Sequence, residues 1–231
     1  MTCPICSGQS AHAADIPFNK SCESDEKSGD LIAYRTCNDC GFSWAPELCA
    51  KPPEWFADNI YNADYHLFDP EYDGARAERQ AKNIIYAYSW ARKQIRHLDY
   101  GSGDGQLTQR LLKAEFDSTA YDPFIHLEAP AGQFNLITCF EVLEHAPDPQ
   151  RVMRHLASYL APEGVLIAST LLSDGNELSD WWYAAPRNGH ISLYSGKSLG
   201  ELAVRHRLCA RISSAGTHSF FHKLPAWAIS S

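Results

Sequence analysis

The sequence has no long apolar run, and basic residues are in the minority. Its longest apolar stretches are far shorter than the roughly 20 residues that a bilayer-spanning helix needs, and the first residues have neither the basic nor the apolar region of a signal peptide. Lys and Arg number 20 against 28 Asp and Glu, so the formal net charge is −8. We therefore expect a cytoplasmic protein without a membrane partner, and a broad nucleic-acid-binding surface is disfavoured.

Internal repeats and low-complexity segments are also missing from the 231 residues. The share of hydrophobic residues, 45%, and of charged residues, 21%, is typical of globular proteins. This length suits one main domain with a small appendage.

Eight cysteines in a reducing compartment are better explained as metal ligands and buried thiols than as four disulfides. Four of them form two C-x-x-C pairs, each followed by turn-forming residues: Cys3, Cys6, Cys37 and Cys40. Two residues between thiols let a tight turn direct both sulfurs at one ion, and two such turns complete a tetrahedral Zn²⁺ site. We predict a zinc ribbon over residues 1–50 with a structural Zn²⁺; redox dithiols or coincidence are the alternatives.

Prolines near residue 50 mark the end of this module, and residues 51–96 are predicted to form a linker with lid helices. A short helix is expected over 54–64. Residues 75–96 contain neither glycine nor proline and carry apolar groups at helical spacing, which predicts an amphipathic helix. The aromatic residues around Tyr61 and Tyr65 are either core or part of a lid over a bound ligand.

A glycine-rich turn follows a short apolar strand that ends at Asp99. The turn consists of four small residues around Asp104: Gly101, Ser102, Gly103 and Gly105. A helix-compatible run begins directly afterwards at Gln106. A strand, a glycine turn and a helix in this order present backbone N–H groups to a ligand at the carboxyl end of a parallel sheet.

The position of the glycines argues against two common phosphate-binding sites. The dinucleotide fingerprint requires a third glycine where this chain has Gln106, and the P-loop requires a Gly-Lys-Ser/Thr sequence that is missing from this turn. The carboxylate of Asp99 also suits an ammonium group better than a pyrophosphate.

The rest of the chain alternates between expected strands and helices: strand 118–121, strand 134–140, helix 150–160, strand 164–169, and an antiparallel hairpin of 208–213 with 218–224. Such alternation is typical of a parallel α/β sheet. Asp122 stands at the tip of the second strand, where an acidic side chain can accept both hydroxyls of a ribose.

Three features together resemble the class I S-adenosylmethionine-dependent methyltransferases over about residues 75–225: the D-x-G-x-G-x-G turn, the acidic strand tip and the run Phe140–His145. The resemblance implies a Rossmann-like core over 97–231, with a doubly wound, mostly parallel sheet and S-adenosylmethionine as cofactor. The segment after Asp122 is short, which indicates a shortened or lost third-strand region. The implied cofactor-binding residues are Asp99, Gly101, Ser102, Gly103, Gly105, Asp122, Phe140 and Glu141.

With the N-terminal cysteine pairs and the run Gly189–Ser195, the chain is similar to a branch that includes sugar C-methyltransferases. This resemblance implies methyl transfer to a small-molecule acceptor, foremost a sugar or sugar nucleotide. An RNA or protein methyltransferase would share the core motifs, and a non-catalytic cofactor-binding or partner-docking module is a second alternative.

Methyl transfer to a hydroxyl or carbon acid needs a base that works near neutral pH. The candidate catalytic residues are His145, His190 and Glu144. Helical spacing places Glu141, Glu144 and His145 on one face, where they would bind Mg²⁺ or Mn²⁺. Alternatively, Glu141 meets the cofactor and Glu144 organises the turn.

The insertion 172–195 is polar and aromatic, without clear periodicity. Trp181, Trp182 and Arg187 are suited to contact a sugar ring or a nucleotide phosphate, and they are equally suited to loop packing.

Overall fold

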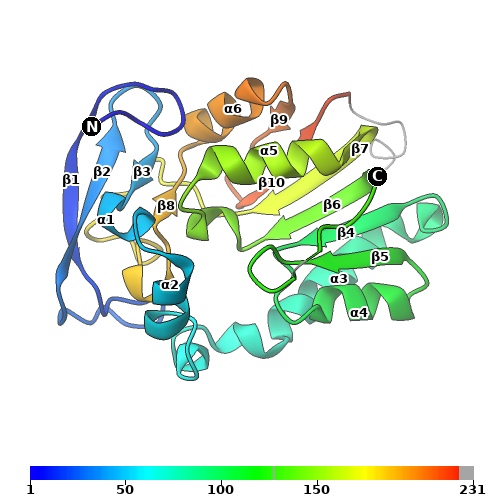
Figure 1. The fold of residues 1–231 in the computed structure, drawn as a ribbon, viewed down its shortest axis with the longest axis horizontal. Coiled ribbons are helices and arrows are strands. Elements are labelled where there is room, and N and C mark those ends of the chain that lie inside the picture. The colour runs from blue at the N-terminus through cyan, green and yellow to red at the C-terminus, as the bar shows by residue number, and fades with distance from the viewer. Residues whose placement is uncertain (127, 224–231) are drawn as a thin grey trace.

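The computed structural model describes residues 1–126 and 128–223, which form two sheets (Figure 1). The larger sheet has the order β5-β4-β6-β7-β10-β9. Its strands are β4 (Arg96–Tyr100), β5 (Asp117–Tyr121), β6 (Phe134–Phe140), β7 (Leu160–Ser169), β9 (Cys209–Arg211) and β10 (Thr217–Phe221). Strands β5, β4, β6 and β7 are parallel, and β10 lies antiparallel between β7 and β9.

This topology confirms the predicted α/β class with a mostly parallel sheet. The closing antiparallel hairpin is also confirmed within the described part of the chain, although Leu224 of the predicted second strand lies outside it. Neighbouring residues of β6 show why the strands are so apolar. Leu136 and Ile137 are both fully buried, and they belong to the cores on opposite faces of the sheet.

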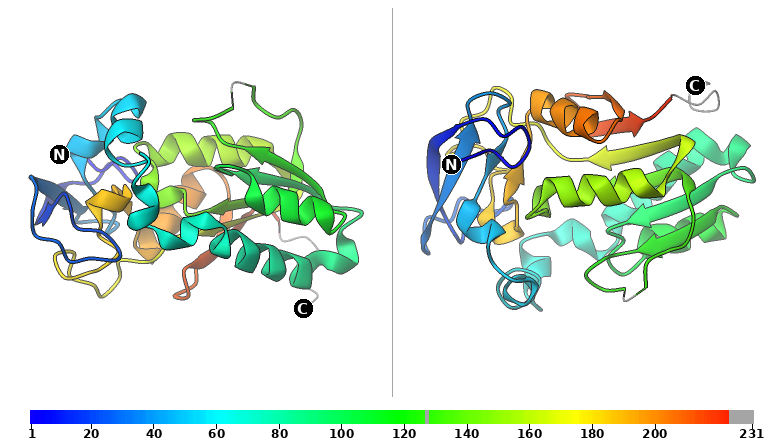
Figure 2. Two further views of the ribbon diagram at one scale, coloured as in Figure 1. Left: turned by 90° about the horizontal axis from the view of Figure 1, so that it is seen from below. Right: turned by 45° about the horizontal axis from the view of Figure 1, so that its top comes forward.

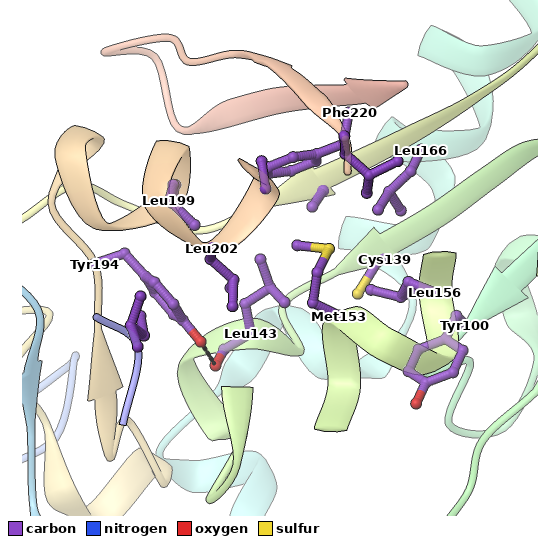
Figure 3. Close-up of a cluster of buried hydrophobic side chains, with 14 of the residues drawn as sticks. Tyr100, Cys139, Leu143, Met153, Leu156, Leu166, Tyr194, Leu199, Leu202 and Phe220 are labelled. Carbon is purple, nitrogen blue, oxygen red and sulfur yellow. Dashed lines mark hydrogen bonds between the residues drawn. The ribbon is translucent and has the colours of Figure 1, made fainter. Parts of the chain in front are cut away.

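Two pairs of helices cover the sheet (Figure 2). Helices α3 (Ala75–Tyr88) and α4 (Gln106–Lys113) lie on one face, while α5 (Pro149–Tyr159) and α6 (Gly196–Arg205) lie on the other. On that second face, Met153 and Leu156 of α5 pack with Leu199 and Leu202 of α6 against β7 and β10 (Figure 3).

Two predicted helices were too long. Helix α2 covers Pro53–Asn59 instead of 54–64, and α3 ends at Tyr88 instead of 96. The chain after Tyr88 turns through a short 3₁₀ segment, η3 (Ser89–Ala91), so that Ile95 is buried before β4 begins. Packing of Ile95 against the sheet therefore overrides the helical pattern of this stretch, which has no proline or glycine to mark the end.

The expected shortening after β5 is present. Residues 122–126 and 128–133, the described part of the connection to β6, contain no strand, and β5 forms the edge of the sheet.

The smaller sheet is antiparallel and has the order β1-β2-β3-β8. Its strands are β1 (Ser10–Pro17), β2 (Leu31–Cys37), β3 (Ser43–Trp44) and β8 (Ser192–Leu193), and helix α1 (Pro46–Cys49) follows β3. The predicted division at residues 50 and 96 stays a prediction. However, β8 comes from the insertion before α6, so the N-terminal sheet is completed by a distant part of the chain, which the sequence analysis did not foresee.

Four further 3₁₀ segments complete the described structure: η1 (Tyr65–Leu67), η2 (Pro70–Asp73), η4 (Leu143–His145) and η5 (Pro186–Asn188). Within residues 1–126 and 128–223, every helix is too short or too polar to cross a membrane.

Candidate active site

The glycine turn joins β4 to α4 in a conformation that only glycine adopts easily. Gly101, Gly103 and Gly105 have φ angles of 73°, 52° and 76°. A Cβ atom on Gly101 would lie 2.3 Å from Cγ2 of Val142, the second residue after β6. The first glycine is therefore required both by the backbone angle and by the close approach of the neighbouring strand end.

In the part of the chain that the structure describes, one side chain of the turn lacks a hydrogen-bond partner, and the turn is joined to Asp122. The Oγ atom of Ser102 is buried and has no hydrogen-bond partner among the described residues. Next to it, the backbone N–H of Gly103 donates to Asp122 Oδ2 over 3.2 Å, and Phe124 N–H donates to Oδ1 over 2.9 Å. Because β4 and β5 are parallel neighbours, the predicted ribose-binding carboxylate lies directly beside the turn.

Asp99 lies beneath the turn, within a buried polar network. It is 4% exposed and accepts hydrogen bonds from the hydroxyls of Thr138 (3.0 Å) and Thr108 (3.3 Å). Burial raises the pKa of this carboxyl to about 6. His97 bridges Ser118 and Thr138 over 2.7 and 2.9 Å, and burial lowers its pKa to about 3. Asp99 thus supports the end of β4, and its contact with an ammonium group stays a prediction.

Phe140 and Glu141 end β6 at the same edge of the sheet. Glu141 has a φ of 55°, which is unusual for a residue other than glycine. Its N–H donates to Ser169 Oγ over 3.0 Å, and the hydroxyl of Ser169 donates back to Glu141 Oε1 over 2.7 Å. This reciprocal pair holds the strained residue, and such strain is often retained at functional sites.

Phe140 and Glu141 also line a cavity of about 540 Å³ between α3, β7, β10 and the insertion. Two arginines of α3 face it, each in a bidentate ion pair. Arg76 binds Asp69 over 2.7 and 2.9 Å, and Arg79 binds Glu71 over 2.8 and 3.1 Å. No motif marks these residues, and the sequence analysis missed them.

His145 and His190 line this cavity, and their rings are 5.0 Å apart. Nδ1 of His145 lies 3.1 Å from the carbonyl oxygen of Gly189, and Nδ1 of His190 lies 2.7 Å from that of Tyr183. Since a carbonyl oxygen can only accept, each Nδ1 carries a proton and each Nε2 retains its lone pair. Burial lowers the pKa of His145 to about 4 and that of His190 to about 3, so both rings are neutral at neutral pH.

Glu144 is fully buried beside the two histidines. Its Oε1 accepts a 2.6 Å hydrogen bond from Tyr183, whereas Oε2 has no partner in the described part of the chain. Burial raises the pKa of this carboxyl well above its usual range. The structure thus brings together all three predicted catalytic residues: one ligand atom each of Glu144, His145 and His190 lie within 4.8 Å of one another. Helical spacing predicted that Glu141 would share one face with Glu144 and His145. Among the described residues, Glu141 is not part of this set.

The insertion divides between packing and the cavity. Arg187 is 7% exposed, donates to the carbonyl of Ile60 over 3.1 Å and lies 3.8 Å over the ring of Phe68, so it packs the preceding loops together. Trp181 is buried, whereas Trp182 is exposed and lines the cavity.

The four paired cysteines come together as predicted, and we call Cys3, Cys6, Cys37 and Cys40 the cysteine cluster. All four sulfurs lie within 4.8 Å of one another, with 3.7 Å between Cys3 and Cys40 and 3.4 Å between Cys6 and Cys37. A tetrahedral site with Zn–S bonds of about 2.3 Å has sulfurs about 3.8 Å apart. Backbone N–H groups of Ile5 and Gly8 donate to the first two sulfurs, each over 3.4 Å. The donor set therefore fits Zn²⁺.

The sheet order, the glycine turn with an acidic neighbour, and the adjoining cavity define a Rossmann-like methyltransferase fold. A family model described as "Methyltransferase domain" matches residues 72–206, more than half of the chain. The chain belongs to this methyltransferase family. The resemblance seen in the sequence is thereby confirmed at the level of the family.

Individual relatives are more distant. The mitochondrial ubiquinone biosynthesis O-methyltransferase of Saccharomyces cerevisiae is 30% identical over 189 residues, 69% of this chain and 57% of the relative. The ubiquinone biosynthesis O-methyltransferase of Escherichia coli O9:H4 is 41% identical over 66 residues, 29% of this chain and 26% of the relative. The chain thus spans about half or less of the length of these relatives. Its cytoplasmic location stays a prediction.

Among solved structures, PigF with SAH superposes with a TM-score of 0.51 at 18% identity, covering 72% of this chain and 61% of that chain. This likeness supports the fold.

Proposed function

We propose that this protein transfers a methyl group from S-adenosylmethionine to a hydroxyl group of a small molecule bound in the cavity. One observation carries the proposal: the residues that end β6, Phe140 and Glu141, lie between the glycine turn and the cavity. A cofactor at the turn and an acceptor in the cavity would therefore meet at this strand end. The names of the two relatives, both O-methyltransferases, support a hydroxyl as the acceptor group.

The residues present at the turn fit this cofactor. The bare backbone at the three glycines admits a ligand closely, the orphaned hydroxyl of Ser102 needs a partner, and Asp122 offers a carboxylate for ribose hydroxyls. When bound, S-adenosylmethionine supplies an electrophilic methyl group on a positively charged sulfur. The chain itself provides alignment of the acceptor with that methyl group.

We assign the base to His145, whose lowered pKa of about 4 keeps Nε2 unprotonated at neutral pH although it also makes the ring a weaker base than an ordinary histidine. Its Nδ1 proton is held by the carbonyl of Gly189, so Nε2 is the atom that accepts the proton of the acceptor hydroxyl. As the oxygen–carbon bond forms and the carbon–sulfur bond breaks, the hydroxyl proton passes to this nitrogen and the sulfonium becomes a neutral thioether. His190 and Glu144 lie close enough to orient the same hydroxyl.

The sugar or sugar nucleotide predicted from the sequence remains our proposed acceptor. The exposed indole of Trp182 offers a face for a sugar ring, and the carboxylate of Glu141 can accept sugar hydroxyls. Guanidinium groups bind phosphate in bidentate fashion, so a nucleotide phosphate in this cavity would replace Asp69 or Glu71 as the partner of Arg76 or Arg79.

The experiment is a transfer assay with methyl-labelled S-adenosylmethionine and separate panels of sugar nucleotides, substituted phenols, RNA and peptides. Label in a sugar nucleotide supports the full proposal, and label in a phenol retains small-molecule O-methylation while overturning the sugar. Transfer only to RNA or peptide, or transfer to none of the panels, contradicts the proposal in favour of the two alternatives.

We also propose that the cysteine cluster binds a structural Zn²⁺. The four cysteines pack in the same buried cluster as the main sheet and helix α5, and metal binding supplies folding free energy to small units of this kind. Metal analysis of the purified protein should give one zinc per chain. A Cys37→Ser variant should lose it, whereas Cys209→Ser, which changes an exposed thiol on β9 outside the cluster, should keep it.

A further inference from the structure

The connection between β1 and β2 reaches from the cysteine-cluster sheet to the cavity. Cys22 and Glu23 of this connection are among the residues that line it. We call residues 20–23 the rim loop. Its sequence gave no sign of this role, because the segment is polar and lies far along the chain from every other lining residue.

Buried contacts fix the rim loop to the insertion. Lys20 is 3% exposed, and its Nζ donates to the carbonyl oxygens of Ser179 (3.1 Å) and Trp181 (2.9 Å). In return, Arg187 N–H donates to the carbonyl of Lys20 over 3.1 Å, and Cys22 N–H donates to Asn188 Oδ1 over 2.8 Å. Burying a charged lysine costs free energy unless its ammonium group is hydrogen-bonded. The two bonds to carbonyl oxygens therefore hold the rim loop against the insertion.

A second link runs from the smaller sheet to the proposed base. Strand β8 pairs with β3, with Leu193 opposite Ser43. We call residues 188–195 together with 143–146 the acceptor wall, because the first segment carries His190 and the second carries Glu144 and His145. Four hydrogen bonds join the two segments: Ile191 N–H to Glu144 O (2.9 Å), Ser192 Oγ to Ala146 O (2.7 Å), Tyr194 OH to Leu143 O (2.9 Å; Figure 3) and His145 Nδ1–H to Gly189 O (3.1 Å).

The cysteine turns themselves are bound to the helices of the main domain. Gln150 of α5 donates to the carbonyl of Ile5 over 2.9 Å, and Arg205 of α6 donates to that of Cys6 over 3.0 Å. At the second turn, Ser195 donates to Cys40 O and Lys197 donates to Asp39 O. Ser195 is also the N-cap of α6 and the last residue of the acceptor wall, so the cluster and the wall share this residue.

We propose that the cysteine cluster is a positioning element of the acceptor site. A metal ion bound by its four thiolates fixes the two turns, and through β3–β8 and the rim loop it holds the acceptor wall in the shape that the reaction needs. The glycine turn is fixed by different contacts: β4 and β5 build it, its Gly103 N–H bonds Asp122, and it meets the end of β6 at Val142, next to the wall. The inference rests on the proposed function, because that function makes this wall part of the acceptor site. The link from the cysteine cluster to residues 188–195 and 143–146 does not depend on which acceptor is bound.

The test compares the metal-loaded protein with protein stripped by a chelator under reducing conditions. Hydrogen exchange followed by mass spectrometry should show at least about a tenfold faster exchange in residues 188–195 after stripping, with exchange in 96–121 unchanged. Calorimetric titration with S-adenosylhomocysteine should give an affinity within about twofold of the loaded protein, and this also shows that the core remains folded. Unchanged exchange in 188–195 after complete metal loss would overturn the inference.

A substitution in the rim loop tests the second link without touching a thiol. Lys20→Met should keep its zinc and its affinity for S-adenosylhomocysteine while exchange in residues 179–190 rises severalfold. Lys27→Met is the matched control, because Lys27 lies in the same connection and is exposed; its exchange should equal that of the parent. Equal exchange in both variants contradicts the role of the rim loop. If the metal-loaded parent protein does not bind S-adenosylhomocysteine, that result counts against the proposed function instead.

Discussion

The two ends of the site are built in different ways. The cofactor end uses residues close together in sequence: the turn 101–105, its supporting network from His97 onward, and Asp122. The acceptor end gathers side chains from Cys22 to Thr217. On the proposed assignment, local backbone geometry defines where the cofactor lies, whereas long-range packing decides which acceptor fits. Changes at one end should therefore leave the other largely intact.

The largest effect is expected at the acceptor end. His145→Gln removes the lone pair proposed to accept the proton, so kcat should fall by roughly 10²–10⁴-fold, the usual contribution of a general base. The affinity for S-adenosylhomocysteine should stay within about twofold. The measurement is steady-state kinetics with the acceptor found in the transfer assay, beside calorimetry.

The matched control is His206→Gln, because His206 bonds Gln150 on the opposite side of the sheet from the cavity. It should retain the parent's kcat. A kcat for His145→Gln within about threefold of the parent would assign the base elsewhere.

At the cofactor end, Gly101→Ala should lower the affinity for S-adenosylhomocysteine by about 100-fold or more. The new Cβ would lie 2.3 Å from Val142, and a left-handed conformation costs an L-residue roughly 1–2 kcal/mol. Gly175→Ala, outside the turn, is the control for an added Cβ at a positive φ, since Gly175 has a φ of 78° but open space around its Cβ position. It should bind S-adenosylhomocysteine as the parent does, and parent-like binding by Gly101→Ala would refute the placement of the ligand.

A smaller loss is expected for Asp122→Ala. Hydrogen bonds to a charged group contribute roughly 1.5–3 kcal/mol, so the affinity for S-adenosylhomocysteine should fall about 10- to 100-fold by calorimetry. Asp104→Ala serves as the comparison, because Asp104 is exposed in the same turn and bonds Gln106. Equal affinities for the two variants would remove Asp122 from the site.

The pH dependence of stability tests the buried network under the turn. Burial raises the pKa of Asp99 from its ordinary 3.8 to about 6, so between these values the folded protein holds a proton that the unfolded chain releases. This contribution to stability is complete below about pH 4 and is lost as the pH rises through 6. Asp99→Asn stays neutral, so its free energy of unfolding relative to the parent should rise by about 1–3 kcal/mol between pH 4 and 7.

Denaturant unfolding at several pH values measures this difference. Asp117→Asn, at an exposed position of β5, should follow the parent. A constant difference between Asp99→Asn and the parent across this range would contradict the buried, protonated carboxyl.

The success of the predictions from sequence differs between the cofactor end and the acceptor end in the same way. Strands β5 and β6 and the turn were predicted nearly to the residue, because apolar runs and glycines are local signals, whereas β7 begins at Leu160, four residues before the predicted start. The cysteine cluster was found for the same reason. The end of α3 at Tyr88 was missed, since burial of Ile95 decides it.

The cavity could not be predicted in this way. Strand β8 is only two residues long and exists through its pairing with β3, and Lys20 of the rim loop bonds main-chain carbonyls about 160 positions away. Arg76 and Arg79 belong to an amphipathic helix whose polar face looks like any solvated surface. Among the residues at the acceptor end, a sequence signal marked His145, His190 and Glu144, together with Phe140, Glu141 and Trp182, from their place after a strand end and in the insertion.

The most direct measurement is a calorimetric titration of the full chain with S-adenosylhomocysteine, followed by the same titration of Gly101→Ala. We expect one saturable site per chain with micromolar affinity in the parent and its loss in the variant. The absence of binding to the parent at high micromolar ligand, or equal binding by both proteins, would contradict the assignment of the glycine turn as the cofactor site.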